Sequence, residues 1–351
     1  MKKRKSILVT GAAGFIGWKV CEFLITHPEL IPKSFLKSFG DSRKLTIVGI
    51  DNLNDYYDVR LKKWRLKQLD KICLNPPYNP VKSNFIFHKI DIENFSGLRR
   101  LFKKHKFDAV INLAARAGVR YSMKNPFVYY KTNVLGNLNL LELCREFSVK
   151  KYILASTSSL YAGQKMPFKE NLPVNEPISP YAASKKSAEV SCYTYHRLYD
   201  IDITILRYFT VYGPAARPDM SPFRFVSWVA QEKPVIIYGD GNQSRDFTYV
   251  DDIARGTIMA LKPMDFEIIN LGGDEPRRLI DFLKVIEKKL NKKAKIVHKP
   301  FHPADLEATW ADITKAKKII GWRPKTKIEK GLENSIAWFK DNSIWAGKIK
   351  L

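Results

Sequence analysis

A tyrosine and a lysine in this chain are spaced so that they could act on one proton. Tyr181 and Lys185 stand in Tyr-Ala-Ala-Ser-Lys, and on a helix this four-residue spacing places both side chains on one face. A free tyrosine has a pKa of about 10, which is too high for a base at neutral pH. A lysine one turn away stabilises the phenolate and lowers that pKa. The pair therefore predicts a general base, the alternative being two residues that only decorate a helix surface.

A phosphate-binding turn is predicted near the N-terminus. The apolar run 5–10 ends in Thr-Gly-Ala-Ala-Gly-Phe-Ile-Gly, and residues 15–25 then carry apolar side chains at helical spacing. This order is strand, tight turn and helix. Glycines let the backbone approach a pyrophosphate, and a helix N-terminus offers it free N–H groups and a favourable dipole. Glycine patterns are common in turns, so this signal needs support from the segments that follow.

The next expected strand, 45–50, ends in Asp51 and Asn52, where an acid can bind the ribose hydroxyls of a dinucleotide. A carboxylate there favours NAD over NADP, because it would repel the 2′-phosphate. An ordinary turn residue at the end of a strand is the alternative for Asp51. The distance from the glycines is longer than the usual roughly 20 residues, which predicts an insertion near residues 32–42.

Two further expected strands, 85–90 and 109–113, end in short polar or small residues. Small residues at the carboxyl end of a strand leave room for a cofactor in the crevice of a doubly wound sheet. Strand and helix patterns alternate along the 351 residues, which predicts an α/β domain with a smaller second region.

Composition limits the classes of function. The formal charge of +25 suits nucleic-acid binding, but the lysines are scattered in pairs along the chain, which favours a lysine-rich soluble surface and makes a nucleic-acid partner unlikely. An acidic substrate would also be steered by such a field. Four cysteines without a Cys-x-x-Cys pair predict no metal site and suit a reducing cytosol. No segment is long and apolar enough for a membrane span.

Together the glycine turn, the run 155–161 and the Tyr181/Lys185 pair resemble the extended short-chain dehydrogenase/reductase family over nearly the whole chain. The resemblance implies a Rossmann-like sheet of about seven strands, bound NAD, and Thr157 as the catalytic Ser/Thr beside Tyr181 and Lys185. Asn133 matches a position that supports the active site, although it could instead cap or bridge helices. The implied cofactor-binding residues are Gly11, Gly14, Phe15, Ile16, Gly17, Asp51, Asn52, Asp91, Ile92, Leu113, Ala114, Ala115, Asn133, Tyr181 and Lys185.

The residues after Thr157 indicate which of the reactions known in this family the chain can catalyse. Family members that dehydrate a nucleotide sugar carry an Asp-Glu pair there, and members that decarboxylate a glucuronate carry a Glu two residues before the tyrosine. This chain has Ser158 and Ser159 after the threonine. Oxidation at C4 of the sugar then has no obvious onward step except return of the hydride, which predicts epimerisation.

The substrate end is predicted from residues 206–220. The segment Arg217-Pro-Asp-Met is similar to UDP-glucuronate 4-epimerases, and the guanidinium of Arg217 suits a carboxylate. Arg217 could alternatively pair with Asp219 or contact phosphate. The resemblance also implies that Arg245 grips the diphosphate and Asp305 the uridine ribose. The candidate substrate-binding residues are Ser122, Thr157, Ser158, Thr210, Arg217, Arg245 and Asp305.

The sequence therefore predicts a Rossmann-like doubly wound parallel sheet over 1–212, with a return segment near 247–271, and a smaller nucleotide-sugar-binding domain built mainly from 213–351. The expected activity is NAD-dependent C4 epimerisation of UDP-glucuronate in the cytoplasm. UDP-glucose 4-epimerase is the first alternative, and a non-enzymatic nucleotide- or RNA-binding protein of this fold is the second. The family resemblance further implies a homodimer formed through helices near 126–147 and 181–199.

Overall fold

A parallel sheet of seven strands forms the centre of the computed structural model, which describes residues 5–37, 44–301 and 305–351. Its strand order is β10-β6-β5-β4-β1-β2-β3. The order reverses between β1 and its neighbour β4, so a crevice opens there at the carboxyl ends of the strands. The seven strands are β1 (Lys5–Thr10), β2 (Leu45–Asp51), β3 (Asn84–Lys89), β4 (Ala109–Asn112), β5 (Lys151–Thr157), β6 (Asp202–Tyr208) and β10 (Phe266–Leu271). The predicted α/β fold class is confirmed.

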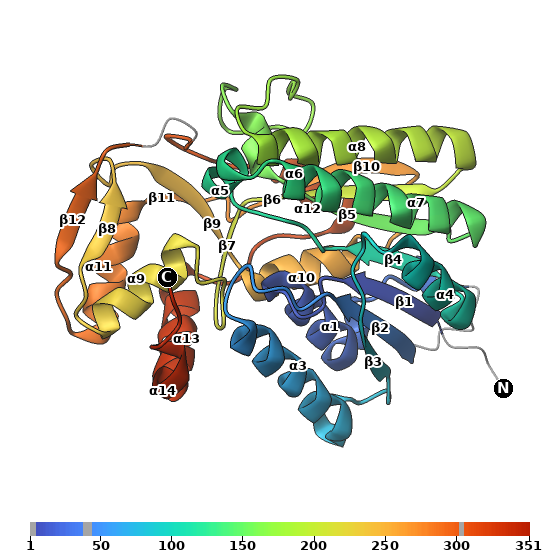
Figure 1. Ribbon diagram of the computed structural model, residues 1–351, viewed down its shortest axis with the longest axis horizontal. Helices are drawn as coiled ribbons and strands as arrows, with labels where there is room; N and C mark the ends of the chain where they lie inside the picture. Colours follow the sequence, from blue (N-terminus) through green and yellow to red (C-terminus); the bar gives the residue numbers. More distant parts are fainter. Residues whose placement is uncertain (1–4, 38–43, 302–304) are drawn as a thin grey trace.

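Helices cover both faces of this sheet (Figure 1). Central strands such as β1 and β5 are nearly continuously buried on both faces, as expected for a parallel sheet. The buried residues accordingly form two clusters, one on each side. One face carries α1 (Phe15–Thr26), α3 (Val59–Leu74) and α10 (Val250–Met259), and the other carries α4 (Phe95–His105), α7 (Gly136–Glu146) and α8 (Pro180–Tyr199).

A smaller group of elements lies beside the sheet, at the left of Figure 1. The parallel pair of β8 (Val235–Tyr238) and β12 (Ile296–Lys299) packs there with helices. These helices are α9 (Ser221–Ala230), α11 (Leu279–Leu290), α13 (Ile328–Asp341) and α14 (Ser343–Ala346). A three-stranded sheet of β7 (Thr210–Tyr212), β9 (Ser244–Tyr249) and β11 (Pro276–Arg278) lies between this group and the central sheet.

The chain passes between the two parts more than once. It leaves the central sheet after β6 and returns with α10 and β10, the latter pairing with β6. Helix α12 (Thr314–Ile320) also packs against β10. The boundary at residue 212 between two domains stays a prediction.

Short elements fill the connections. Between α1 and β2 lie η1 (Pro28–Leu30) and α2 (Lys33–Leu36), where an insertion is expected; residues 38–43 of that insertion fall outside the described part of the chain. The remaining short elements are η3 (Pro76–Tyr78), α5 (Val119–Lys124), α6 (Phe127–Tyr129), the π-helical turn η4 (Tyr130–Leu135) and η5 (Ser158–Tyr161).

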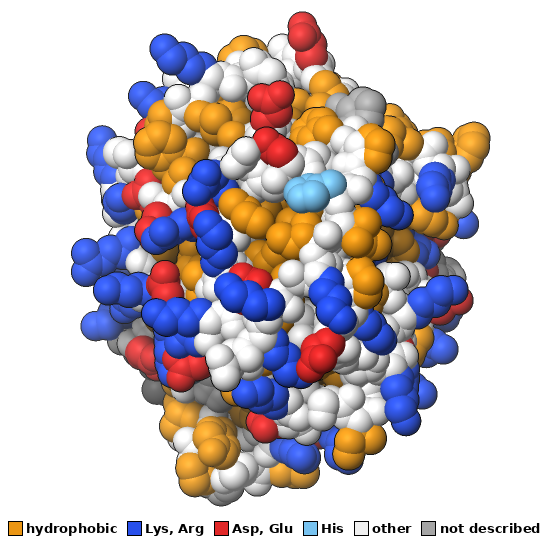
Figure 2. Space-filling view, turned by 90° about the vertical axis from the view of Figure 1, so that its left-hand side faces the viewer, with side chains coloured by type: hydrophobic (Ala, Val, Ile, Leu, Met, Phe, Trp, Pro, Cys, Tyr) orange, Lys and Arg blue, Asp and Glu red, His pale blue; other side chains and the backbone are white. Residues whose placement is uncertain are grey.

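The basic surface has no single stripe on the face seen in Figure 2. Lys and Arg side chains are spread over that face, with acidic side chains between them. Among the helices of the described residues, none is long and apolar enough to cross a membrane. The four cysteines are all free thiols.

Candidate active site

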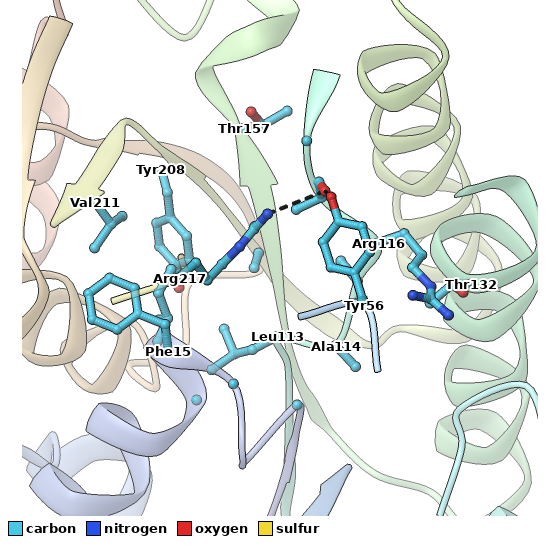
Figure 3. Close-up of a pocket in the computed structure, with 18 of the residues that line it drawn as sticks. Phe15, Tyr56, Leu113, Ala114, Arg116, Thr132, Thr157, Tyr208, Val211 and Arg217 are labelled. Atoms are coloured by element: carbon cyan, nitrogen blue, oxygen red, sulfur yellow. Dashed lines mark hydrogen bonds between the residues drawn. The ribbon is translucent and has the colours of Figure 1, made fainter. Parts of the chain in front are cut away.

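A cavity of about 340 Å³ lies at the carboxyl ends of the central strands, where the strand order reverses. It extends from the glycine turn to the segment that follows β7 (Figure 3). Most of the residues proposed from the sequence line it: Gly11, Gly14, Phe15, Ile16, Gly17, Asp51, Asn52, Asp91, Ile92, Leu113, Ala114, Ala115, Thr157, Ser158, Tyr181, Lys185, Thr210 and Arg217.

The glycine turn fits a bound dinucleotide. Gly11 has a φ of +66°, and a Cβ there would lie 2.9 Å from the backbone nitrogen of Ala114. A Cβ on Gly17 would lie 2.1 Å from the carbonyl oxygen of Gly11, so any side chain would force the turn and the helix apart. Helix α1 begins directly after Gly14 with no side-chain cap and no acidic residue in its first turn. Its N–H groups are therefore directed to an anion such as a pyrophosphate.

A carboxylate lies where the adenosine ribose is expected. Asp51 is buried at the end of β2; its Oδ1 accepts from the backbone N–H of Leu53 at 2.8 Å and lies 3.4 Å from Nζ of Lys62. Asn52 donates to Asp91 at 2.7 Å, which joins the ends of β2 and β3. Together with the glycine turn, these groups fit NAD. Sequence reasoning missed Lys62, whose position eleven residues after Asp51 in the following helix was the available signal.

Tyr181, Thr157 and Lys185 converge at the other end of the cavity. Thr157 ends β5, and Tyr181 lies in the first turn of α8, which Ser179 caps by accepting from the N–H of Ala182. Burial raises the pKa of Tyr181, whereas a hydrogen bond with Thr157 and the charge of Arg217 lower it. The sequence predicts that Lys185 lowers this pKa; among the described residues the lowering comes from Thr157 and Arg217.

Lys185 is buried on the same face of α8, one turn after Tyr181. Burial lowers its pKa to about 8, and the carboxylate of Glu189 acts in the opposite direction. Glu189 accepts from Ser156 at 2.5 Å and from two nitrogens of Arg207 at 3.0 and 2.7 Å. The buried Arg207–Glu189 pair therefore holds in place the carboxylate that partly offsets the effect of burial on the pKa of Lys185.

Arg217 lines the cavity, but part of its guanidinium is already engaged. Nε and Nη2 donate to Asp219 at 3.1 and 2.5 Å, and Nη2 also donates to the carbonyl oxygen of Ala117 at 3.3 Å, the bond drawn beside Tyr56 in Figure 3. The pairing with Asp219 that the sequence left open is thus present. Nη1 makes no hydrogen bond to the described residues, so one donor edge of Arg217 is not used by the protein. Tyr56, which sequence reasoning missed, donates to the same Ala117 oxygen at 2.6 Å.

Ser122 and Asn133 do not line the cavity. Ser122 is fully buried and donates to the carbonyl oxygen of Val119. Asn133 accepts from the N–H of Arg116 at 2.8 Å and donates to the Arg116 carbonyl and to the hydroxyl of Ser184, both at 2.9 Å. It bridges the loop after β4 to α8, and its role in supporting the active site stays a prediction. Arg116 itself lines the cavity, and Figure 3 shows its side chain directed towards Thr132.

Arg245 and Asp305 form a separate group outside the cavity lining. Asp305 makes an ion pair with Arg120, whose guanidinium lies 3.7 Å from the ring centroid of Tyr238. Arg245 donates to the carbonyl oxygen of Ser244 at 2.7 Å, and burial lowers its pKa. The predicted diphosphate and ribose residues are thus close to one another, with Arg120 as a third member that the sequence did not identify. Their roles as substrate ligands stay predictions. No metal-binding cluster of His, Cys, Asp or Glu occurs within residues 5–37, 44–301 and 305–351.

Comparisons with known proteins agree with this geometry. The family model described as GDP-mannose 4,6 dehydratase matches residues 8–335. A UDP-glucuronate 4-epimerase of Thermodesulfobacterium geofontis is 53% identical over 345 residues, which cover 98% of this chain and 99% of that protein.

Solved structures are also similar. The UDP-glucuronic acid 4-epimerase of Bacillus cereus in complex with UDP-glucuronic acid and NAD has a TM-score of 0.84 and 37% identity, covering 96% of this chain and 99% of the other. The UDP-glucose 4-epimerase of Thermotoga maritima with UDP-glucose has a TM-score of 0.80 and 30% identity, with the same coverage. The resemblance seen in the sequence is confirmed: the chain belongs to the GDP-mannose 4,6 dehydratase family of extended short-chain dehydrogenases/reductases.

Proposed function

We propose that the protein is an NAD-dependent 4-epimerase that interconverts UDP-glucuronate and UDP-galacturonate. The placement of acids in the cavity carries this proposal. Asp51 and Asp91, both at the expected adenosine end, are the carboxylates among the described residues that line it. Ser158 and Ser159 lie beside Thr157, so the reacting end offers no acid for dehydration or for proton transfer beyond C4.

Tyr181 is the general base in this proposal. Its phenolate takes the proton from the C4 hydroxyl of the sugar and becomes the neutral phenol, and Thr157, to which Tyr181 is hydrogen-bonded, positions the reacting C4 oxygen. Thr157 and the charge of Arg217 favour the phenolate, and Lys185 is a further cation one helical turn away, whose pKa Glu189 raises against the effect of burial. NAD, when bound along the glycine turn, supplies the acceptor for the C4 hydride and its return to the opposite face. Tyr181 then gives the proton back to the inverted C4 oxygen.

The uronate is favoured over a neutral hexose by Arg217 and by the relatives. Nη1 of Arg217 is a charged donor without a hydrogen-bond partner among the described residues, and Ser158 and Thr210 line the same cavity. The Thermodesulfobacterium geofontis and Bacillus cereus relatives carry the uronate in their names, and their identities of 53% and 37% exceed the 30% of the UDP-glucose 4-epimerase. UDP-glucose remains the second candidate, because a protein of closely similar fold binds it.

We further propose that two copies pair through α7 and α8. Apolar side chains on and beside these helices are exposed: Phe127 is 83% exposed, and Val190 and Tyr193 are each 53% exposed. Several exposed large apolar side chains on neighbouring helices are typical of a subunit interface. Light scattering on the purified protein should give twice the chain mass. A cytoplasmic location is supported by the four free thiols, which suit a reducing compartment.

The activity is tested by incubating the purified protein separately with UDP-glucuronate and UDP-glucose and following the anomeric protons of the sugars by NMR. We expect UDP-galacturonate from the uronate and much slower conversion of the hexose. Conversion of UDP-glucose alone would replace the proposal with the second candidate, and conversion of neither sugar would refute both.

A further inference from the structure

Arg65 is a fully buried cation that has no carboxylate partner in the described part of the chain. It lies in α3 with 0% of its surface exposed, and it makes no ion pair with the residues that the structure describes. Its Nη1 donates to the carbonyl oxygen of Ala13 at 2.9 Å and to the hydroxyl of Tyr57 at 2.7 Å. Its Nε and Nη2 donate to the carbonyl oxygen of Ala215 at 3.3 and 2.7 Å.

Burying Arg65 in this way costs folding free energy that an apolar side chain would not cost. A buried charge that meets only neutral acceptors loses its hydration without gaining a counter-ion. Arg65 also adds to the cations already present, since its charge contributes, after burial, to lowering the pKa of Lys62. Leu61 and Leu69, one turn before and one turn after on the same helical face, are fully buried and apolar. An apolar side chain at position 65 would therefore continue the packing of this face.

The two carbonyl groups that Arg65 joins belong to segments that lie far apart in the sequence. Ala13 is in the glycine turn, between Gly11 and Gly14. Ala215 follows β7, in the segment that leads to Arg217. Its φ of +52° is in the left-handed region, which an alanine adopts only at an energetic cost. Ala215 is fully buried, so its carbonyl oxygen needs protein donors, and two nitrogens of Arg65 supply them.

We propose that Arg65 is a positioning residue that holds the cofactor-binding turn and the substrate-binding segment at a fixed distance from each other. The guanidinium fixes the Ala13 carbonyl on one side and the left-handed Ala215 on the other, so each side is ordered by the same group. Arg217, two residues after Ala215, is thereby presented to the cavity at a set distance from the glycine turn. Loss of Arg65 loosens NAD and the sugar nucleotide together. The sugar-nucleotide part of this inference rests on the proposed function.

The test compares Arg65→Met with Leu69→Ala on purified holoenzyme. Arg65→Met keeps an unbranched side chain in the core and removes the donors, whereas Leu69→Ala opens a cavity on the same face of α3 without touching either carbonyl. Three quantities are measured for each: the melting temperature, the rate of NAD loss during dialysis, and the Kd of UDP-glucuronate by calorimetry. We expect Arg65→Met to speed NAD loss and raise the Kd by about tenfold each, the size expected for lost charged hydrogen bonds. Leu69→Ala should lower the melting temperature. The rate of NAD loss and the Kd of UDP-glucuronate should stay within about twofold of the wild-type values, because no contact in the site changes.

Arg65→Lys keeps the test decisive if the methionine variant does not fold. Lysine retains the charge but lacks the planar fork that reaches both carbonyls. It should fold and still weaken NAD retention or UDP-glucuronate binding by about threefold or more, since hydrogen bonds to one side are lost. Wild-type values for both ligands in the lysine variant, or equal losses in Leu69→Ala, would overturn the role of Arg65. Failure of the proposed function is seen separately, because it is scored on wild-type protein and NAD loss needs no sugar substrate.

Discussion

Replacing Arg217 by alanine tests the choice between a uronate and a neutral hexose. The structure limits what this arginine can offer a ligand, because Asp219 and Ala117 already occupy Nε and Nη2. Only the Nη1 edge is without a hydrogen-bond partner in the described part of the chain. A carboxylate that meets this edge gains one or two charged hydrogen bonds beside a cation that is largely shielded from water, its side chain being 20% exposed.

The expected magnitude follows from that geometry. Hydrogen bonds to charged groups contribute about 1.5–3 kcal/mol, and the lower end applies because a single edge is free. Arg217→Ala should therefore weaken UDP-glucuronate by about tenfold more than UDP-glucose. General damage occurs as well, since Asp219 loses its ion-pair partner. Tyr56 and Tyr129 still donate to the Ala117 oxygen, at 2.6 and 3.3 Å, so the loop before α5 stays held.

The assay measures the Kd of UDP-glucuronate and of UDP-glucose by calorimetry. Binding of the two sugar nucleotides can be compared even where the enzyme converts one of them slowly. The ratio of the two values cancels damage that both ligands share. Asp219→Asn is the matched control: it keeps the shape of the partner, removes its charge and leaves Arg217 free, so UDP-glucuronate binding should be retained or tightened. Equal losses on both ligands in Arg217→Ala would place the guanidinium on the shared diphosphate and refute its role in selecting the uronate.

Three further outcomes are expected. Tyr181→Phe should lower kcat by at least about 10²-fold while the melting temperature is unchanged, since only the proton-transferring hydroxyl is lost; a near-wild-type rate would mean that another base acts. Denaturing the purified protein should release NAD detectable by its absorbance, because the same bound molecule must accept and return the hydride; full activity of NAD-free protein without added NAD would contradict this. UDP-glucuronate should yield UDP-galacturonate with little carbon dioxide, because Ser158 and Ser159 supply no acid; UDP-pentose as the main product would reverse the assignment.

The fold followed from patterns that are local in the sequence. The run 5–10, the glycines and the helix after them occupy consecutive residues, and each imposes its own conformation: the strand by burial on both faces, the turn by the positive φ of Gly11, and the helix by its apolar spacing. The same is true of Tyr181 and Lys185, whose spacing already places them on one face of α8. Such features can be read without knowing any distant contact.

The parts of the site that sequence reasoning missed depend on contacts between distant segments. Arg120 meets Asp305, and Tyr56 meets the carbonyl of Ala117, across more than 60 positions in each case. Neither residue stands in a motif, because the chemistry arises only where loops from different strands meet. Whether Arg217 pairs with Asp219 could not be decided from the sequence for a different reason. Asp219 is two residues away, but only the backbone between them determines whether the two side chains can pair.

Arg65 and Arg207 show which signals a sequence carries for a buried cation. Both are almost fully buried, but Arg207 is neutralised by Glu189 whereas Arg65 meets two backbone carbonyls and a tyrosine hydroxyl. A carboxylate partner can be sought among the acids of a sequence; a carbonyl partner cannot, because every residue has one. The remaining signal for Arg65 is its place between Leu61 and Leu69 on the apolar face of α3. A lone arginine on such a face must find acceptors inside the protein, and the uncapped backbone around a ligand-binding turn and a left-handed alanine is where unsatisfied carbonyl groups are available.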